Sequence, residues 1–217
     1  MNKFPNNSEL SGIKAIFLDL DNTLYDYHAS HKYALFICSR KFSKNYGVSS
    51  KGFYGLYENS KKIVKKIVPT QAASHSRLLY FQVLFENYLG KTNVKATLEY
   101  ESLYWRSFIA KMVLFNDALN FLKNCKKNKI KICLITDLTA RIQFEKIEFL
   151  KIAKYIDYIV SSEEVGEEKP SSKIFNLAIQ KVRVNRSKIL VLGDDYKRDI
   201  LGAKRMGLRS YLTCANK

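Results

Sequence analysis

The sequence predicts an α/β fold with a mainly parallel sheet, helices on both faces and an all-helical insert. Two observations lead to this fold. From residue 116 onward, short apolar runs alternate with stretches whose apolar residues recur every three or four positions, as strands joined by crossover helices do. Residues 27–112 show the helical spacing alone. A chain of 217 residues with 47% hydrophobic content can build one core carrying such an insert.

The first predicted strand covers residues 13–18 (IKAIFL), an apolar run that ends directly before Asp19. Helices are then expected over residues 28–46, 51–68, 72–89 and 98–112, with breaks at Gly47, Pro69, Gly90 and Asn93. The chain is therefore expected to form two domains: a core of residues 1–26 and 113–217, and an insert of residues 27–112. We expect the insert to cover the end of the first strand as a lid.

The second part of the chain repeats helix and strand in turn. Helices are expected over residues 118–127, 139–150, 172–181 and 198–206, and strands over residues 131–136, 158–161, 188–192 and 209–213. Right-handed crossovers between such strands give a parallel sheet whose carboxyl ends share one edge. Ligands bind at that edge in open α/β sheets.

Polar side chains follow several of these strands. Asp19 and Asp21 follow the first, and their i, i+2 spacing lets both face one point. Thr136 closes a later strand, Lys169 precedes a helix, and Asp194, Asp195 and Asp199 follow the strand ending near Gly193. Each residue alone has an ordinary interpretation as a turn or helix cap. Together they offer a nucleophile, a hydroxyl, a cation and carboxylates for a metal, which phosphoryl transfer requires.

The order and spacing of these residues resemble the haloacid dehalogenase-like hydrolase superfamily over almost the whole chain. DLDNTLYD from Asp19 matches the first motif, LIT ending at Thr136 the second, Lys169 in EEVGEEKPSSKIF the third, and GDDYKRDILGAKRMGL from Gly193 the fourth. The resemblance implies a Rossmann-like core and a helical cap of the C1 type. Within that group, SSEEVGEEKP and GDDYKRDILGA resemble N-acylneuraminate-9-phosphatase and the pyrimidine 5′-nucleotidases.

The resemblance also implies an Mg²⁺-dependent phosphatase of small phosphorylated metabolites, such as a sugar phosphate or a nucleotide. Asp19 would attack phosphorus and form an aspartyl-phosphate, while Asp21 would protonate the leaving alcohol and later deprotonate water. Thr136 would bind phosphoryl oxygens, and Lys169 would balance the negative charge of Asp19 and the phosphate.

The implied Mg²⁺ ligands are Asp19, the backbone carbonyl of Asp21, and Asp194, because a hard cation prefers oxygen. Asp195 and Asp199 are not expected to bind the metal directly. They would orient the metal ligands and Lys169 through hydrogen bonds.

One departure from the family pattern concerns Asp137-Leu138, which stand where Asn-Gly commonly follows the second-motif Thr. A carboxylate there would be repelled by phosphate unless it points away or pairs with a cation, and Arg141 is the candidate.

Two other functions stay open at this stage. A phosphomutase uses the same core residues, whereas a dehalogenase motif lacks the second Asp. A non-catalytic protein that binds anions or nucleic acid would use the insert, which has 14 basic and 4 acidic side chains. The basic residues of the insert include Lys61, Lys62, Lys65 and Lys66, and its tyrosines include Tyr54, Tyr57, Tyr80, Tyr88, Tyr100 and Tyr104. Tyrosines at helical spacing more often pack in a core.

The remaining features are general. His28 and His31 lie three residues apart on one helix and are interpreted as a surface pair. The widely spaced Cys38, Cys125, Cys133 and Cys214 indicate reduced thiols rather than disulfides or zinc ligands. With no signal-peptide pattern and no apolar run near 18 residues, we expect a cytoplasmic protein, monomeric or homodimeric, without membrane or nucleic-acid partners.

Overall fold

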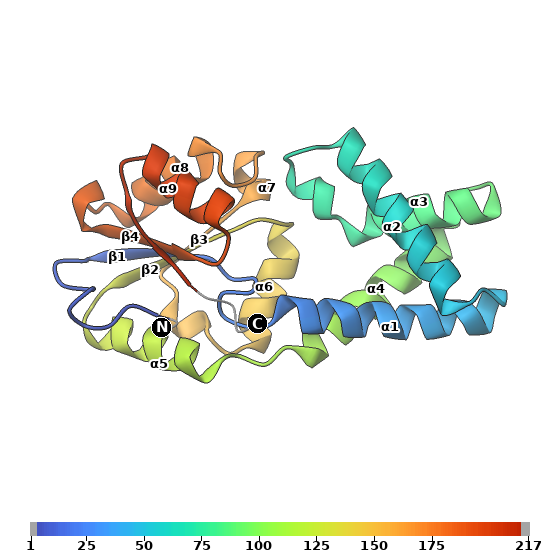
Figure 1. Ribbon diagram of the computed structural model, residues 1–217, viewed down its shortest axis with the longest axis horizontal. Helices are drawn as coiled ribbons and strands as arrows, with labels where there is room; N and C mark the ends of the chain where they lie inside the picture. Colours follow the sequence, from blue (N-terminus) through green and yellow to red (C-terminus); the bar gives the residue numbers. More distant parts are fainter. Residues whose placement is uncertain (1–3, 214–217) are drawn as a thin grey trace. The chain divides into compact units, whose positions relative to one another are not determined.

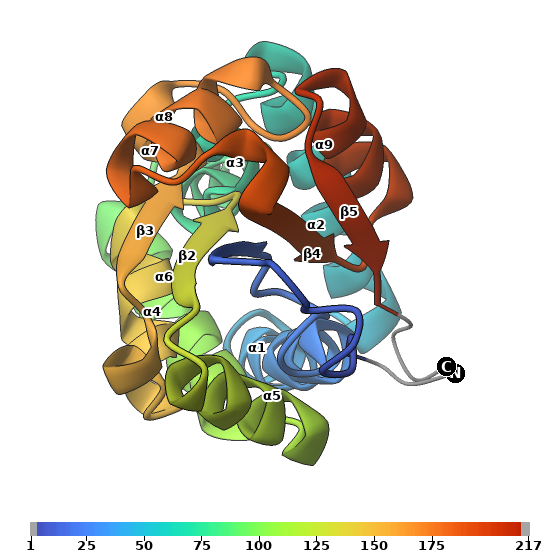
Figure 2. The same ribbon diagram turned by 90° about the vertical axis from the view of Figure 1, so that its left-hand side faces the viewer.

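The computed structural model describes residues 4–213 of the chain. The chain divides into two compact units. The sheet unit consists of Met1–Asp26 and Val113–Lys217, and the helical unit consists of Tyr27–Met112. Figures 1 and 2 show their elements from two directions.

The sheet unit contains a five-stranded parallel sheet with the order β3-β2-β1-β4-β5. Its strands are β1 (Ala15–Leu18), β2 (Lys131–Thr136), β3 (Tyr158–Ser161), β4 (Ile189–Gly193) and β5 (Arg209–Leu212). Leu18 of β1 lies opposite Leu134 of β2 and Leu192 of β4. The predicted α/β fold with a parallel sheet is confirmed, and the segments that follow β1, β2 and β4 leave the sheet at one edge.

Helices cover both faces of this sheet. The elements are α5 (Asn116–Lys127), α6 (Ala140–Phe149), α7 (Ser162–Val165), α8 (Ser172–Val182) and α9 (Leu201–Arg205), with short 3₁₀ helices η2 (Ala153–Tyr155) and η3 (Arg186–Lys188). Helices α8 and α9 lie on one side of the sheet and α5 on the other (Figures 1 and 2). Phe17 and Val191 of the sheet pack with Phe175 of α8 and Ala203 of α9 in one buried cluster.

The last predicted helix of the sheet unit begins earlier than its apolar spacing indicates. A π-helical turn, η4 (Tyr196–Ile200), precedes α9. Its cap is Asp195, whose carboxylate accepts hydrogen bonds from the backbone N–H groups of Lys197 and Arg198. A side chain that satisfies the first N–H groups lets a helix start at that point.

The helical unit is built from α1 (Tyr27–Tyr46), α2 (Ser50–Ile67), η1 (Ala72–His75), α3 (Arg77–Leu89) and α4 (Val94–Lys111). The single helix expected over residues 72–89 is divided, because Ser76 caps α3 by accepting the N–H of Leu79. Aromatic side chains fill the core, including Phe42, Phe53, Tyr57, Tyr80, Phe81, Phe85, Tyr100, Tyr104 and Phe108. Four of the six tyrosines considered as stacking groups therefore pack inside.

His31 corrects the interpretation of a surface pair. His28 is exposed, but the His31 ring stacks on Tyr27 and its Nδ1 lies 2.5 Å from the Tyr104 hydroxyl oxygen. Burial, with the nearby Arg77 guanidinium, lowers the pKa of His31 to about 3. His31 is therefore a neutral member of the helical unit's aromatic core.

Three of the four cysteines lie in the described part of the chain. Cys38, Cys125 and Cys133 are buried free thiols, as predicted, and Cys214 lies outside the described residues. Burial raises the pKa of each of these three thiols to about 12. Between residues 4 and 213, the helices are too short or too polar to cross a membrane.

The partly buried, neutral His31 predicts an acid-sensitive helical unit. Its pKa of about 3 in the folded state lies below the ordinary 6.5, so between these values the unfolded chain binds the extra proton. As the pH is lowered from about 6.5 to about 3, the free energy of unfolding should therefore decrease by up to about 1.4 kcal/mol per pH unit because of this residue. We expect His31→Gln to flatten the pH dependence measured by urea denaturation, whereas His28→Gln should not. Equal pH dependence in the two variants would contradict this assignment.

Candidate active site

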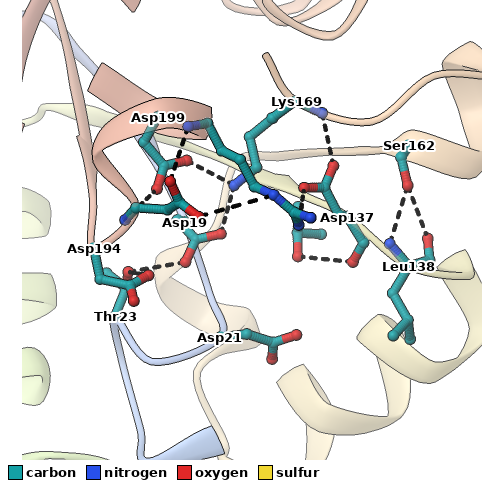
Figure 3. A network of polar contacts seen from close by, with 12 residues as sticks. Asp19, Asp21, Thr23, Asp137, Leu138, Ser162, Lys169, Asp194 and Asp199 are labelled. Atoms are coloured by element: carbon teal, nitrogen blue, oxygen red, sulfur yellow. Dashed lines mark hydrogen bonds and ion pairs between the residues drawn. The ribbon is translucent and has the colours of Figure 1, made fainter. Parts of the chain in front are cut away.

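A buried lysine joins the carboxylates at the edge of the sheet. Lys169 is 5% exposed, and its Nζ lies 2.6 Å from Oδ1 of Asp19 and 2.8 Å from Oδ1 of Asp199 (Figure 3). Burial acts to lower the pKa of Lys169, but Asp19 and Asp199 outweigh it and raise this pKa well above its usual value. The site therefore contains a fixed cation.

Asp19 is held at both of its carboxylate oxygens. Lys169 binds Oδ1, and the Thr23 hydroxyl donates to Oδ2 at 2.8 Å. The backbone N–H of Asp19 donates to the carbonyl of Leu192 at 2.9 Å, which extends the β1–β4 ladder by one residue. The sheet and two side chains thus fix the orientation of this carboxylate.

Three carboxylates gather beside Lys169. One side-chain oxygen from each of Asp19, Asp194 and Asp199 lies within 4.8 Å of the others. Burial, together with neighbouring carboxylates, raises the pKa of Asp19 and of Asp194. Three negative charges against one lysine leave a deficit of positive charge, and oxygen donors suit a hard divalent cation. The residues present therefore fit a metal site, although the predicted carbonyl ligand from Asp21 remains a prediction.

The Asp21 side chain belongs to a different group of contacts. Lys146 of α6 places its Nζ 2.8 and 3.0 Å from the two oxygens of Asp21, and Tyr25 donates its hydroxyl proton to the same carboxylate. Burial acts to raise the pKa of Asp21, but the charge of Lys146 and these hydrogen bonds lower it overall. The two aspartates of the first motif therefore have separate cationic partners.

Thr136 ends β2 with a buried hydroxyl. Nε2 of Gln143, also on α6, donates to its Oγ1 at 2.5 Å and to the carbonyl of Asp137 at 2.7 Å. Within residues 4–213, the Thr136 hydroxyl proton has one acceptor, the Asp137 carbonyl, at the long distance of 3.4 Å. This proton is therefore free to turn toward a ligand oxygen.

Asp137 pairs with a different cation from the one expected. Its Oδ1 accepts the backbone N–H of Lys169 at 2.9 Å, and its Oδ2 lies 3.3 Å from Arg198 Nη1. Arg141 is exposed and pairs instead with Glu145, one turn along α6. Position i+4 on a helix is the nearest partner of an exposed arginine, whereas Asp137 precedes the helix.

The structure brings one of the two remaining acidic residues to Lys169. Asp199 contacts Lys169 directly, while the carboxylate of Asp195 caps η4 and is half-exposed. The link from Asp195 to the site is its backbone N–H, which donates to Oδ2 of Asp199 at 3.1 Å.

Comparisons with known proteins agree with this arrangement. The family model for haloacid dehalogenase-like hydrolases matches residues 13–207. The chain belongs to this family. It is 34% identical to ribulose-1,5-bisphosphate 5-phosphatase from Halopiger xanaduensis, with 91% of this chain and 83% of that protein covered. It is also 24% identical to mouse N-acylneuraminate-9-phosphatase, covering 93% and 82% of the two chains.

A solved structure shares the fold of this chain. A haloacid dehalogenase-like phosphatase from Thermococcus onnurineus superimposes with a TM-score of 0.73, covering 92% of this chain and 86% of that one at 20% identity. The predicted family resemblance is confirmed, and the chain is a haloacid dehalogenase-like hydrolase.

Sequence reasoning missed two residues in the candidate site of this hydrolase, Gln143 and Lys146. They come from α6, not from a strand end. A signal was present: Gln143, Lys146 and Leu150 lie at i, i+3 and i+7, the spacing of a buried helix stripe. A lysine and a glutamine on such a stripe indicate a polar group beneath the helix.

The Lys169 network predicts a strict requirement for glycine at position 193. A Cβ there would lie 2.1 Å from Oδ2 of Asp199, so Gly193→Ala must displace that carboxylate from Lys169. Breaking a buried ion pair costs about 3–5 kcal/mol, and we expect a loss of this size in urea denaturation. Gly55→Ala is the control, because its Cβ has open space and alanine favours a helix by about 1 kcal/mol. Equal stability of the Gly193→Ala variant and the unmodified protein would refute the packing argument.

Proposed function

We propose that this hydrolase is a Mg²⁺-dependent phosphatase that cleaves small phosphorylated metabolites through an aspartyl-phosphate on Asp19. The observation that carries the proposal is the Asp19 carboxylate, fixed by Lys169 and Thr23 beside Asp194 and Asp199. A fixed carboxylate next to a cation and a set of oxygen donors suits attack on a phosphate ester.

In the first half of the reaction, Asp19 attacks phosphorus as the bond to the leaving oxygen breaks. Asp21 gives its proton to that oxygen, so the product leaves as an alcohol. In the second half, Asp21 takes a proton from water, which attacks phosphorus, and the Asp19–phosphorus bond breaks to release inorganic phosphate. Asp21 supports the choice of phosphate esters, because a halide leaving group would need no proton.

Lys169 and Thr136 are assigned to the transferring group. Lys169 is a buried cation on Asp19, and it would balance the charge that the phosphoryl group brings. The Thr136 hydroxyl would donate to a phosphoryl oxygen, since in the described part of the chain its proton has only a long contact. Both groups are held in place before substrate binds, which lowers the reorganisation needed for the reaction.

Mg²⁺ would be held by Asp19 and Asp194, with the carbonyl of Asp21, and Asp199 would orient Lys169 beside them. When bound, the cation supplies positive charge that stabilises the phosphoryl oxygens during transfer.

The proposed substrate class is a small, strongly anionic ester, either a sugar phosphate or a nucleotide. The 34% identical relative is named for a sugar bisphosphate, which favours the first of these. The helical unit carries a net charge of +10 from its 14 basic and 4 acidic residues, which would attract anions. We propose that this unit is the cap that selects the substrate.

The acidic cluster predicts that activity depends on a divalent cation. Excess EDTA should abolish hydrolysis of 4-nitrophenyl phosphate, and Mg²⁺ should restore it. Mg²⁺ should also raise the melting temperature, because a ligand bound only to the folded state stabilises it. Asp194→Asn should weaken both effects and shift them to higher Mg²⁺ concentrations. Full turnover after metal removal would overturn the proposed function.

The two aspartates of the first motif predict different losses. Asp19→Asn removes the nucleophile and should leave no more than trace activity in a folded protein. Asp21→Asn removes the proton carrier and should slow turnover by a factor of about 10² to 10⁴. Mass spectrometry of the Asp21→Asn variant mixed with substrate should find phosphate on Asp19. Asp117→Asn, an exposed site in α5, is the control, and phosphate on any other residue would show that the roles are wrong.

A further inference from the structure

Lys146 is a buried cation, and a contribution to stability alone does not explain why a charged residue lies there. Its side chain is fully buried on α6, and its Nζ contacts both oxygens of Asp21. Removing an ammonium from water costs several kcal/mol, and a well-packed apolar side chain at such a site is often as stable. Ile142 and Ile147 beside it are buried and apolar, so an apolar residue would suit this helix face.

The contact geometry of Lys146 limits how Asp21 can move. Two contacts of 2.8 and 3.0 Å to one carboxylate hold its plane as well as its position. In Figure 3, Asp21 stands apart from the hydrogen-bonded network around Lys169, without a dashed line to it. The ion pair of Lys146 is with Asp21, whereas that of Lys169 is with Asp19.

Gln143, one turn before Lys146, ties this ion pair to the expected phosphate pocket. Its Nε2 faces three oxygens: Thr136 Oγ1 at 2.5 Å, the Asp137 carbonyl at 2.7 Å and Asp21 Oδ2 at 3.4 Å. Three acceptors around one atom require it to be the amide nitrogen. Its Oε1 is buried and has no hydrogen-bond partner among residues 4–213. The unpaired oxygen destabilises the folded state, and the hydrogen bonds of Nε2 offset this loss.

We propose that Lys146 is the positioning residue of the proton carrier. Lys146 holds the Asp21 carboxyl group in one orientation, and Gln143 sets that orientation relative to the Thr136 hydroxyl. An Asp21 held in this orientation would deliver its proton, once protonated, to the leaving oxygen of an ester whose phosphoryl group is bound at Thr136. This inference rests on the proposed phosphatase function. Lys146 touches Asp21 and not the reacting atoms, so it acts through Asp21.

The test uses leaving groups that differ in their need for a proton. Substituted phenyl phosphates share one shape, and 4-nitrophenolate departs unprotonated while 4-methylphenolate benefits from an acid. The ratio kcat/KM reports every step up to release of the phenol. It is measured for the unmodified protein, for Lys146→Met and for Arg141→Met, whose exposed residue lies on the same helix.

We expect Lys146→Met to hydrolyse 4-nitrophenyl phosphate within about threefold of the unmodified rate. The loss should grow along the series to about tenfold or more for 4-methylphenyl phosphate, part of the 10²–10⁴ that an acid supplies. Arg141→Met should show no such trend. An equal loss for every leaving group, or no loss, would overturn the proposal. If Lys146→Met does not fold, Lys146→Gln, which keeps a hydrogen-bond donor, is measured in the same way.

A double-mutant cycle separates a positioning role from a general structural one. If Lys146 acts through Asp21, the variant Asp21→Asn with Lys146→Met should be no slower than Asp21→Asn alone. Multiplied losses would mean an independent role and would refute the proposal. If the unmodified protein hydrolyses none of the phosphates, the proposed phosphatase function itself fails. Activity of the unmodified protein without a leaving-group trend in Lys146→Met overturns the positioning role alone.

Discussion

The buried ammonium of Lys169 is the constraint on which the candidate active site of the sheet unit depends. A buried cation is tolerated only where carboxylates approach it closely, and here they come from residues following β1 and β4. The strand order places β1 beside β4, which brings Asp19 and Asp199 to one point. Gly193 completes the arrangement, because any side chain there would occupy the space of the Asp199 carboxylate. The strand order and the small size of Gly193 therefore both allow Lys169 to contact Asp19 and Asp199.

The sequence predicted the parts of this site that follow from the order of strands. Each strand end carries its polar residue directly, so Asp19, Thr136 and Asp194 are placed once the parallel sheet is inferred. The β3 and β2 boundaries were also predicted to the residue, because turn residues and changes of apolar pattern bound them.

The parts that escaped prediction depend on tertiary packing. The cation that pairs with Asp137 is Arg198, which lies in the π-helical turn η4. His31 has the spacing of a surface residue, yet its ring contacts Tyr27 and Tyr104 of the helical unit. Spacing along one helix identifies which residues share a face. It does not identify which side chains of other elements contact that face, and those side chains determine the ion pair of Asp137 and the partial burial of His31.

Two carboxylates at i and i+2 can have different roles only if their surroundings differ. Asp19 lies beside Asp194 and Asp199, and burial with these charges raises its pKa despite Lys169. Asp21 has Lys146 and Tyr25 as partners, and its pKa is lowered. Each aspartate has its own lysine, so the two negative charges do not compete for one cation. Separate partners therefore give the two carboxylates at this strand end different surroundings. The second lysine, on α6, is therefore as much a part of this division as the lysine of the third motif.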